Sequence, residues 1–239
     1  MYYVVYGFLW LISLLPFRVL HFFADVIYTL VFYVFKYRRE VVMNNLEIAF
    51  PEKTVMERLK IAKQFYHNLI DSFIETIKFI SITPKAAFKR SSADVELINQ
   101  LIEKGYNVHA MACHQFNWEW INLHWSIHLK QPLVIVYMPI SSKPINRLFL
   151  KLRTAFGTVM LPATESRKAF VAWRNKLHAL ALIADQKPAS PAYSYWLHFF
   201  GRPTPFVTGP EKNAAMKKCP VIFGRVTKPA RGKYESTLI

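Results

Sequence analysis

The sequence has 239 residues, 53% of them hydrophobic, so it is long enough to bury a full core and too apolar to be disordered. Its 31 lysines and arginines against 15 acidic residues give a formal net charge of +16, which attracts phosphates, anionic lipid, nucleic acid or an acidic protein. The two cysteines, Cys113 and Cys219, exclude a disulfide scaffold and favour a reducing compartment.

The N-terminal segment is strongly apolar. No charged side chain precedes Arg18, and a second apolar run covers residues 26–35. Pro16 is predicted to end or kink the first helix. A cleavable signal peptide is disfavoured because no basic region precedes the first run, whereas a spanning helix, a hairpin and an interfacial anchor remain alternatives.

Three basic residues follow this segment directly, namely Lys36, Arg38 and Arg39. Basic clusters beside a membrane anchor tend to stay cytoplasmic and to face anionic headgroups. We therefore expect residues 1–35 to be a membrane anchor or interfacial segment. Residues 36–239 are then expected to form a single domain on the cytoplasmic side.

Residues 40–80 show apolar side chains at three- and four-residue steps, which predicts helix. Beyond them, buried strands are predicted at residues 108–112, 133–138, 177–184 and 221–226. Helices are predicted at residues 94–104, 118–128, 145–156, 167–175 and 211–218. This alternation predicts an α/β fold with a largely parallel central sheet flanked by helices.

Polar residues at the ends of the predicted strands are the first site candidates, because ligands of parallel sheets gather beyond the carboxyl ends of the strands. His114 follows the first strand, and Asp185 follows the third. Glu119 lies five positions after His114, a step of about 140° on a continuous helix, so the two meet only if a turn separates them. In that arrangement His114 can act as a general base and Glu119 can orient it. The alternative is that both are structural polar residues.

Other chemistries find less support in the sequence. Cys113 is expected to face the core when its neighbour His114 faces the site. The histidines lack the spacing of a zinc site, and no glycine-rich phosphate loop is present, so we expect neither metal nor cofactor. Aromatic residues gather in apolar runs instead of interleaving with basic ones, which favours lipid over nucleic acid as the anionic partner.

Thr208 and Gly209, followed by Pro210, have the pattern of a helix start. Free backbone N–H groups at such an end favour a phosphate or a developing oxyanion. An ordinary capped helix is the alternative. Both residues are kept as candidates for substrate binding.

Several of these residues, taken in order, carry a resemblance to a known family. The quoted segments are His114-x4-Glu119, Arg153, Asp185-Gln186, Phe199-Phe200-Gly201 with Thr208-Gly209-Pro210, and the stretch from Arg38-Arg39 through Asn45-Leu46 to Phe50-Pro51-Glu52. Together they resemble the late lauroyl/myristoyl acyltransferases of lipid A biosynthesis, which belong to the lysophospholipid acyltransferase superfamily. The resemblance covers nearly the whole chain.

The resemblance implies transfer of a fatty acyl chain from acyl carrier protein to a hydroxyl of a phosphorylated glycolipid, a lipid A precursor. The reaction would take place without a cofactor at the cytoplasmic face of a bacterial inner membrane. His114 resembles the general base and Glu119 its partner. Arg153, with Arg167 as the alternative, is expected to bind lipid phosphate or steady the oxyanion, and Asp185 to organise the site.

The acidic carrier and the acceptor phosphates would be served by a basic surface comprising Lys143, Arg147, Lys151, Arg167 and Lys168. Two features depart from the family pattern. Lys187 stands where a second acidic residue is usual, and the chain ends at Ile239, where the family usually continues, so the catalytic domain is expected to be truncated. O-acylation of a glycerophospholipid or aminolipid, and a non-catalytic membrane protein that binds anionic lipid, remain alternatives.

Overall fold

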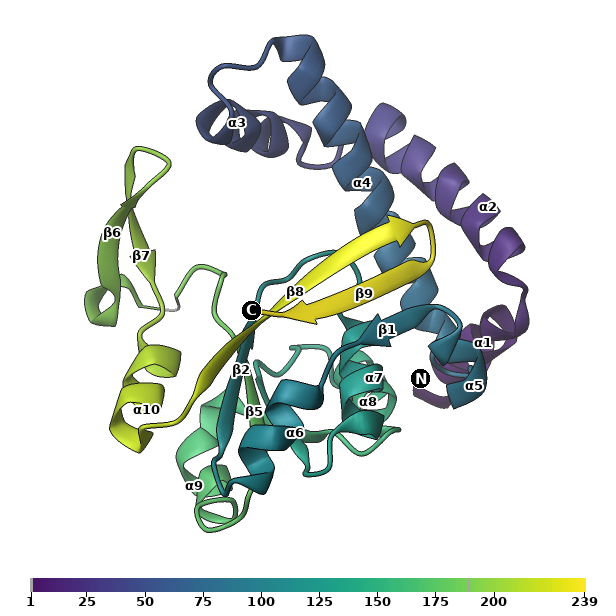
Figure 1. Ribbon diagram of the computed structural model, residues 1–239. Coiled ribbons are helices and arrows are strands. Elements are labelled where there is room, and N and C mark those ends of the chain that lie inside the picture. The colour runs from purple at the N-terminus through teal and green to yellow at the C-terminus, as the bar shows by residue number, and fades with distance from the viewer. Residues whose placement is uncertain (1, 189) are drawn as a thin grey trace. The chain divides into compact units, whose positions relative to one another are not determined.

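The computed structural model describes residues 2–188 and 190–239, apart from the side chains of residues 166 and 167. Its contacts divide the chain into two compact units. The helical unit comprises residues 7–82 and 198–203. The sheet unit comprises residues 1–6, 83–197 and 204–239. Figure 1 labels their elements.

The helical unit is built from long helices with an aromatic core. Its elements are α1 (Tyr2–Leu14, which begins in the sheet unit), α2 (Phe17–Thr29), a five-residue π-helix (Leu30–Val34), α3 (Arg39–Ala49) and α4 (Val55–Lys78). The predicted break at Pro16 is confirmed, because α1 ends and α2 begins around it. Helices α2 and α4 lie side by side (Figure 1), and Tyr28, Phe32 and Tyr66 are buried between them.

A capping box starts α4: Thr54 Oγ1 accepts from the Glu57 N–H, and a Glu57 carboxylate oxygen accepts from the Thr54 N–H. Among the described residues, the continuous stretch Phe17–Val34 is long and apolar enough to cross a bilayer, and only 22% of it is buried. The predicted N-terminal apolar helix is therefore present as a candidate membrane anchor.

The sheet unit contains a seven-stranded sheet in the order β1-β9-β8-β2-β5-β3-β4. Neighbouring strands run parallel except for β8 and β9, the long antiparallel pair drawn in yellow in Figure 1. The strands are β1 (Ser91–Ala93), β2 (Val108–Ala112), β3 (Leu133–Tyr137), β4 (Val159–Pro162), β5 (Ala179–Ile183), β8 (Val221–Ala230) and β9 (Lys233–Leu238). The predicted α/β fold with a mostly parallel sheet is confirmed.

Helices connect these strands. They are α5 (Pro84–Phe88), α6 (Glu96–Glu103), α7 (Glu119–His128), α8 (Lys143–Thr154), α9 (Ser166–Val171) and α10 (Gly209–Lys217), with single 3-10 turns at Ala163–Glu165 and Pro191–Tyr193. A separate two-stranded sheet is made by β6 (Tyr195–Phe199) and β7 (Arg202–Phe206). The sequence analysis did not predict these two strands.

Alternate residues of the central strands cover opposite faces of the sheet, as the period of a strand requires. Val134 and Leu180 pack against Phe170 of α9. The neighbouring Leu133 and Ala181 point to the other face, toward α7. Parallel sheets are normally covered on both faces, and these strands accordingly read as continuous apolar runs.

Candidate functional site

Two polar side chains meet at the carboxyl edge of the sheet. His114 lies two residues beyond the end of β2, and Asp185 lies two residues beyond the end of the neighbouring strand β5. His114 Nδ1 is 2.7 Å from Asp185 Oδ1, and the His114 backbone N–H donates to Asp185 Oδ2 at 2.8 Å. The carboxylate therefore fixes both the backbone and the ring of the histidine.

This pairing determines which ring nitrogen can react. A carboxylate only accepts hydrogen bonds, so Nδ1 of His114 carries the proton and Nε2 presents a lone pair. Nε2 makes no hydrogen bond within the described part of the chain, and 35% of the His114 side chain is exposed. The arrangement can take a proton from a hydroxyl at Nε2.

A second carboxylate, Glu119, lies at the first position of α7 and is paired with Arg153 from α8. Arg153 Nη2 and Nε donate to Glu119 Oε1 at 2.6 and 2.9 Å, and Nε also approaches Oε2 at 3.2 Å. The sequence analysis expected Glu119 to be the direct partner of His114. The structure gives that place to Asp185, because Glu119 is engaged by the guanidinium and begins a helix beyond the turn.

The turn between His114 and Glu119 supplies the rotation that a continuous helix could not. Phe116 lies in the left-handed region with φ 48°, which is uncommon for a bulky residue and reverses the chain locally. Gln115 anchors the same turn, since its Oε1 accepts from the Val226 N–H of β8 at 3.1 Å.

Burial raises the pKa of Glu119, and the charges of Arg153 and His114 lower it in part. The effect of His114 indicates that the two groups interact through space without a hydrogen bond. By the same interaction, an ionised Glu119 stabilises a protonated His114. Glu119 is therefore an electrostatic neighbour of the histidine.

Trp118 joins the two ion pairs. Its ring lies edge-on to the His114 ring with centroids 5.9 Å apart, and the Arg153 guanidinium lies 4.7 Å above the Trp118 ring. A cation over the face of an indole is attracted by the ring quadrupole. Sequence reasoning missed Trp118, although its place between His114 and Glu119 was a signal.

An apolar cavity of about 40 Å³ lies between α7 and the sheet. Since one water-sized sphere needs roughly 10–15 Å³, its width suits a slender group. The lining is almost entirely apolar and includes Trp118, which also touches His114 and Arg153. Small side chains on the strands leave the space open, namely Ala110, Ala112, Ala181 and Gly224.

A comparison with protein families matches residues 1–237 to the model of the bacterial lipid A biosynthesis acyltransferases. The chain therefore belongs to this family. Acyl transfer of the lipid A biosynthesis type, with a lipid acceptor and an acyl donor in a membrane context, is its expected activity. A search of curated proteins found no match.

Other predicted residues of this acyltransferase lie apart from the His114–Asp185 pair. Thr208 precedes α10, but its side chain does not cap the helix and donates instead to the Tyr193 carbonyl at 3.4 Å. Gly209 is the first residue of α10. The side chain of Arg167 is outside the described residues.

Cys113 of the acyltransferase is partly buried. Burial raises the pKa of its thiol, and the negative charge of Asp185 adds to the effect. A thiol kept protonated is a poor nucleophile. The expectation that Cys113 is not the reactive group of the site therefore has physical support.

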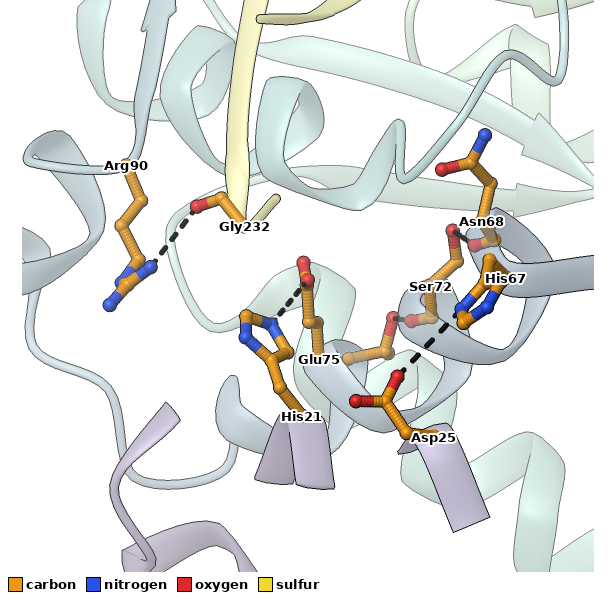
Figure 2. A network of polar contacts seen from close by, with 9 residues as sticks. His21, Asp25, His67, Asn68, Ser72, Glu75, Arg90 and Gly232 are labelled. Atoms are coloured by element: carbon orange, nitrogen blue, oxygen red, sulfur yellow. Dashed lines mark hydrogen bonds and ion pairs between the residues drawn. The ribbon is translucent and has the colours of Figure 1, made fainter. Parts of the chain in front are cut away.

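One group of side chains in the helical unit has donors of the kind that bind metals. His21, Asp71 and Glu75 bring their ligand atoms within 4.8 Å of one another. Figure 2 shows His21 of α2 directed at Glu75 of α4, and the His21 Nε2 to Glu75 Oε1 distance is 2.9 Å. Because His21 already uses this nitrogen for Glu75, the geometry favours a polar contact between two helices.

Proposed function

We propose that this acyltransferase moves a fatty acyl chain from acyl carrier protein to a hydroxyl of a lipid A precursor at the cytoplasmic face of the inner membrane. The observation that carries the proposal is the His114–Asp185 pair, whose exposed imidazole lies beside an apolar cavity. A base supplies the attacking alkoxide, and an apolar cavity suits an acyl chain.

In the proposed reaction the acceptor hydroxyl gives its proton to Nε2 of His114 while its oxygen attacks the thioester carbon. The tetrahedral intermediate then collapses, the C–S bond breaks, and the imidazolium returns the proton to the departing thiolate. Asp185 holds the reactive tautomer, and the negative charge of Glu119 favours the imidazolium.

Arg153 is proposed to serve the anionic parts of the reaction. Glu119 occupies its Nε and one Nη2 hydrogen, so the hydrogens of Nη1 are the donors available to a phosphate or an oxyanion. The bidentate pair and the Trp118 ring fix the direction of the guanidinium. A fixed donor stabilises developing charge without reorganisation.

The carrier protein is proposed to dock on α8, whose exposed face carries Lys143, Arg147 and Lys151 at four-residue steps. Residues spaced in this way share one side of a helix. The same helix carries Arg153, so a carrier bound there would lie close to the site. An acidic carrier would be attracted to this row electrostatically.

The test uses the full chain in vesicles with a lauroyl or myristoyl carrier protein and a phosphorylated glycolipid acceptor. Mass spectrometry of the lipid product should show one added acyl chain for the wild type and roughly 10²- to 10⁴-fold less for His114→Ala. His128→Ala, an exposed histidine of α7, is the matched control and should retain product. Acylation of glycerophospholipid in place of the glycolipid would reject the acceptor, and equal product from His114→Ala would reject the mechanism.

A further inference from the structure

The hairpin of β6 and β7 presents large apolar side chains to the outside. Every residue of β6 is exposed, including Tyr195, Trp196 and Phe199, and Phe200 follows at the tip with 53% of its surface exposed. An isolated two-stranded hairpin is only marginally stable in water. This exposed aromatic surface therefore calls for a partner.

The turn of the hairpin places an aromatic ring where other residues are preferred. Phe200 and Gly201 form the two-residue loop with φ of 49° and 71°, the signature of a turn that favours Asn-Gly. The ring of Phe200 packs edge-on against Phe199 with centroids 4.5 Å apart. A bulky residue in this conformation is costly, so its exposed ring is a feature that needs a function.

Polar groups next to the hairpin are satisfied within their own segment. The Trp196 indole N–H donates to the Pro191 carbonyl at 3.2 Å, and Ser194 Oγ donates to the Ser190 carbonyl at 2.9 Å. The Trp196 ring can therefore leave water without exposing an unpaired donor. Tryptophan and tyrosine are enriched at membrane interfaces for this combination of an apolar ring and a satisfied polar end.

Two prolines in β7, Pro203 and Pro205, argue against pairing with another protein strand. Proline lacks an N–H, so in a hairpin it is tolerated where its nitrogen faces away from the partner strand. The outer edge of β7 thus lacks donors at two alternate positions. Such an edge resists strand addition, and it also has fewer donors to leave unpaired near lipid.

The charge of the segment matches an anionic surface. Between Gln186 and Pro210 the sequence has no acidic residue, whereas it contains Lys187 and Arg202. Each basic residue near an anionic leaflet adds attraction that falls off within the Debye length.

We propose that the β6–β7 hairpin inserts its aromatic tip into the interface of an anionic lipid bilayer, as a second membrane contact besides the N-terminal apolar helices. The hairpin begins ten residues after Asp185. Its docking would keep the segment that leaves the site beside the lipid surface. This inference concerns membrane contact and does not depend on the acyl-transfer chemistry.

The test measures Trp196 fluorescence in the full chain reconstituted into vesicles whose lipids are brominated at shallow or deep acyl positions. The difference between wild type and Trp196→Phe isolates the signal of this indole. We expect that signal to be quenched by shallow bromines, and more strongly in anionic than in zwitterionic vesicles. Trp173→Phe is the control, because Trp173 packs in the core of the sheet unit and its signal should be unaffected by bromine.

A second variant, Phe199→Ser with Phe200→Ser, should abolish the bromine quenching of Trp196 while the far-ultraviolet circular dichroism stays unchanged. His114→Ala should leave the quenching intact, which separates this inference from the proposed catalysis. An unquenched Trp196 signal would overturn the proposal. So would cross-linking that places the hairpins of two copies against each other and shields them from lipid.

Discussion

Two histidine–carboxylate pairs occur in this protein, one in each unit, and they differ in their surroundings. His114 and Asp185 meet at 2.7 Å with 35% and 29% of their side chains exposed. His21 and Glu75 meet at 2.9 Å, but His21 is 16% exposed and Glu75 is fully buried. The first pair lies on loops after two parallel strands, and the second joins α2 to α4.

The comparison shows that the residue types alone do not define a catalytic pair. Loops at strand ends leave Nε2 of His114 accessible, whereas the His21 ring uses Nε2 for Glu75 between two packed helices. Ligand-binding residues gather on such loops because a rigid scaffold positions them. The difference makes His114–Asp185 a candidate for chemistry and His21–Glu75 a candidate for helix packing.

Removing the carboxylate of each pair should separate the two roles most strongly. Asp185→Asn should lower turnover roughly 10²- to 10⁴-fold because the imidazole loses its tautomer and its charge partner, with little change in melting temperature. Glu75→Ala should destabilise by about 1–3 kcal/mol, because it leaves buried polar groups unpaired, and should leave turnover per folded molecule near wild type. Steady-state kinetics and thermal melts of both variants measure this. A loss of turnover in Glu75→Ala without a stability change would reverse the assignment.

The Glu119–Arg153 pair offers a test of burial within the site itself. The two side chains are 10% and 15% exposed, so removing one should cost about 3–5 kcal/mol, since it leaves the other charge buried and unpaired. The double variant Glu119→Leu with Arg153→Met should recover part of that loss in melting temperature. The exposed pair Lys130–Glu103 is the control and should show little change when either residue is replaced. Additive losses in the double variant would contradict the coupling.

A third histidine, His124 of α7, has another histidine as its neighbour. Burial, aided by the charge of His128, lowers the pKa of His124 to about 4. The unfolded chain therefore takes up a proton between the ordinary pKa of about 6.5 and pH 4 that the folded chain refuses. Stability should be full above pH 6.5 and fall as the pH drops toward 4. Melting temperatures of His124→Gln across this range should depend less steeply on pH, and an unchanged slope would exclude His124 as the cause.

The smallest expected effect concerns the cavity. A Cβ added at Gly224 would lie 3.0 and 3.2 Å from two ring atoms of Trp125, so Gly224→Ala should push this ring into the cavity. One methylene of lost burial is worth about 0.8 kcal/mol, roughly a fourfold change in preference toward the shorter donor. The kcat/KM ratio for carrier-bound myristoyl and lauroyl chains measures it. Gly7→Ala, where an added Cβ meets nothing within 4 Å, should leave the ratio unchanged.

Hydrophobic periodicity predicted much of the fold, because buried strands and amphipathic helices leave strong patterns. The four predicted strands and the break at Pro16 are present. Shorter or polar elements were missed: β1 has three residues, and β9 reads Lys-Tyr-Glu-Ser-Thr-Leu with few apolar positions. Their pairing depends on contacts distant in sequence, which periodicity does not encode.

The candidate site was predictable only at the level of position. Strand ends predicted where His114 and Asp185 lie, but the choice between Asp185 and Glu119 as the partner of His114 depends on the φ of Phe116 and on the engagement of Glu119 by Arg153. Neither feature has a signal in local sequence. The neighbouring strands β2 and β5 brought together residues 71 positions apart.

The alternation of β2 and β5 also has an evolutionary consequence. Ala110, Ala112 and Ala181 face the cavity, whereas the polar pair sits on loops beyond the same strands. Larger residues at the alanine positions would narrow the space without touching the imidazole or its carboxylate. Descendants of this sequence could therefore diverge in the fatty acid they accept while inheriting unaltered proton-transfer residues.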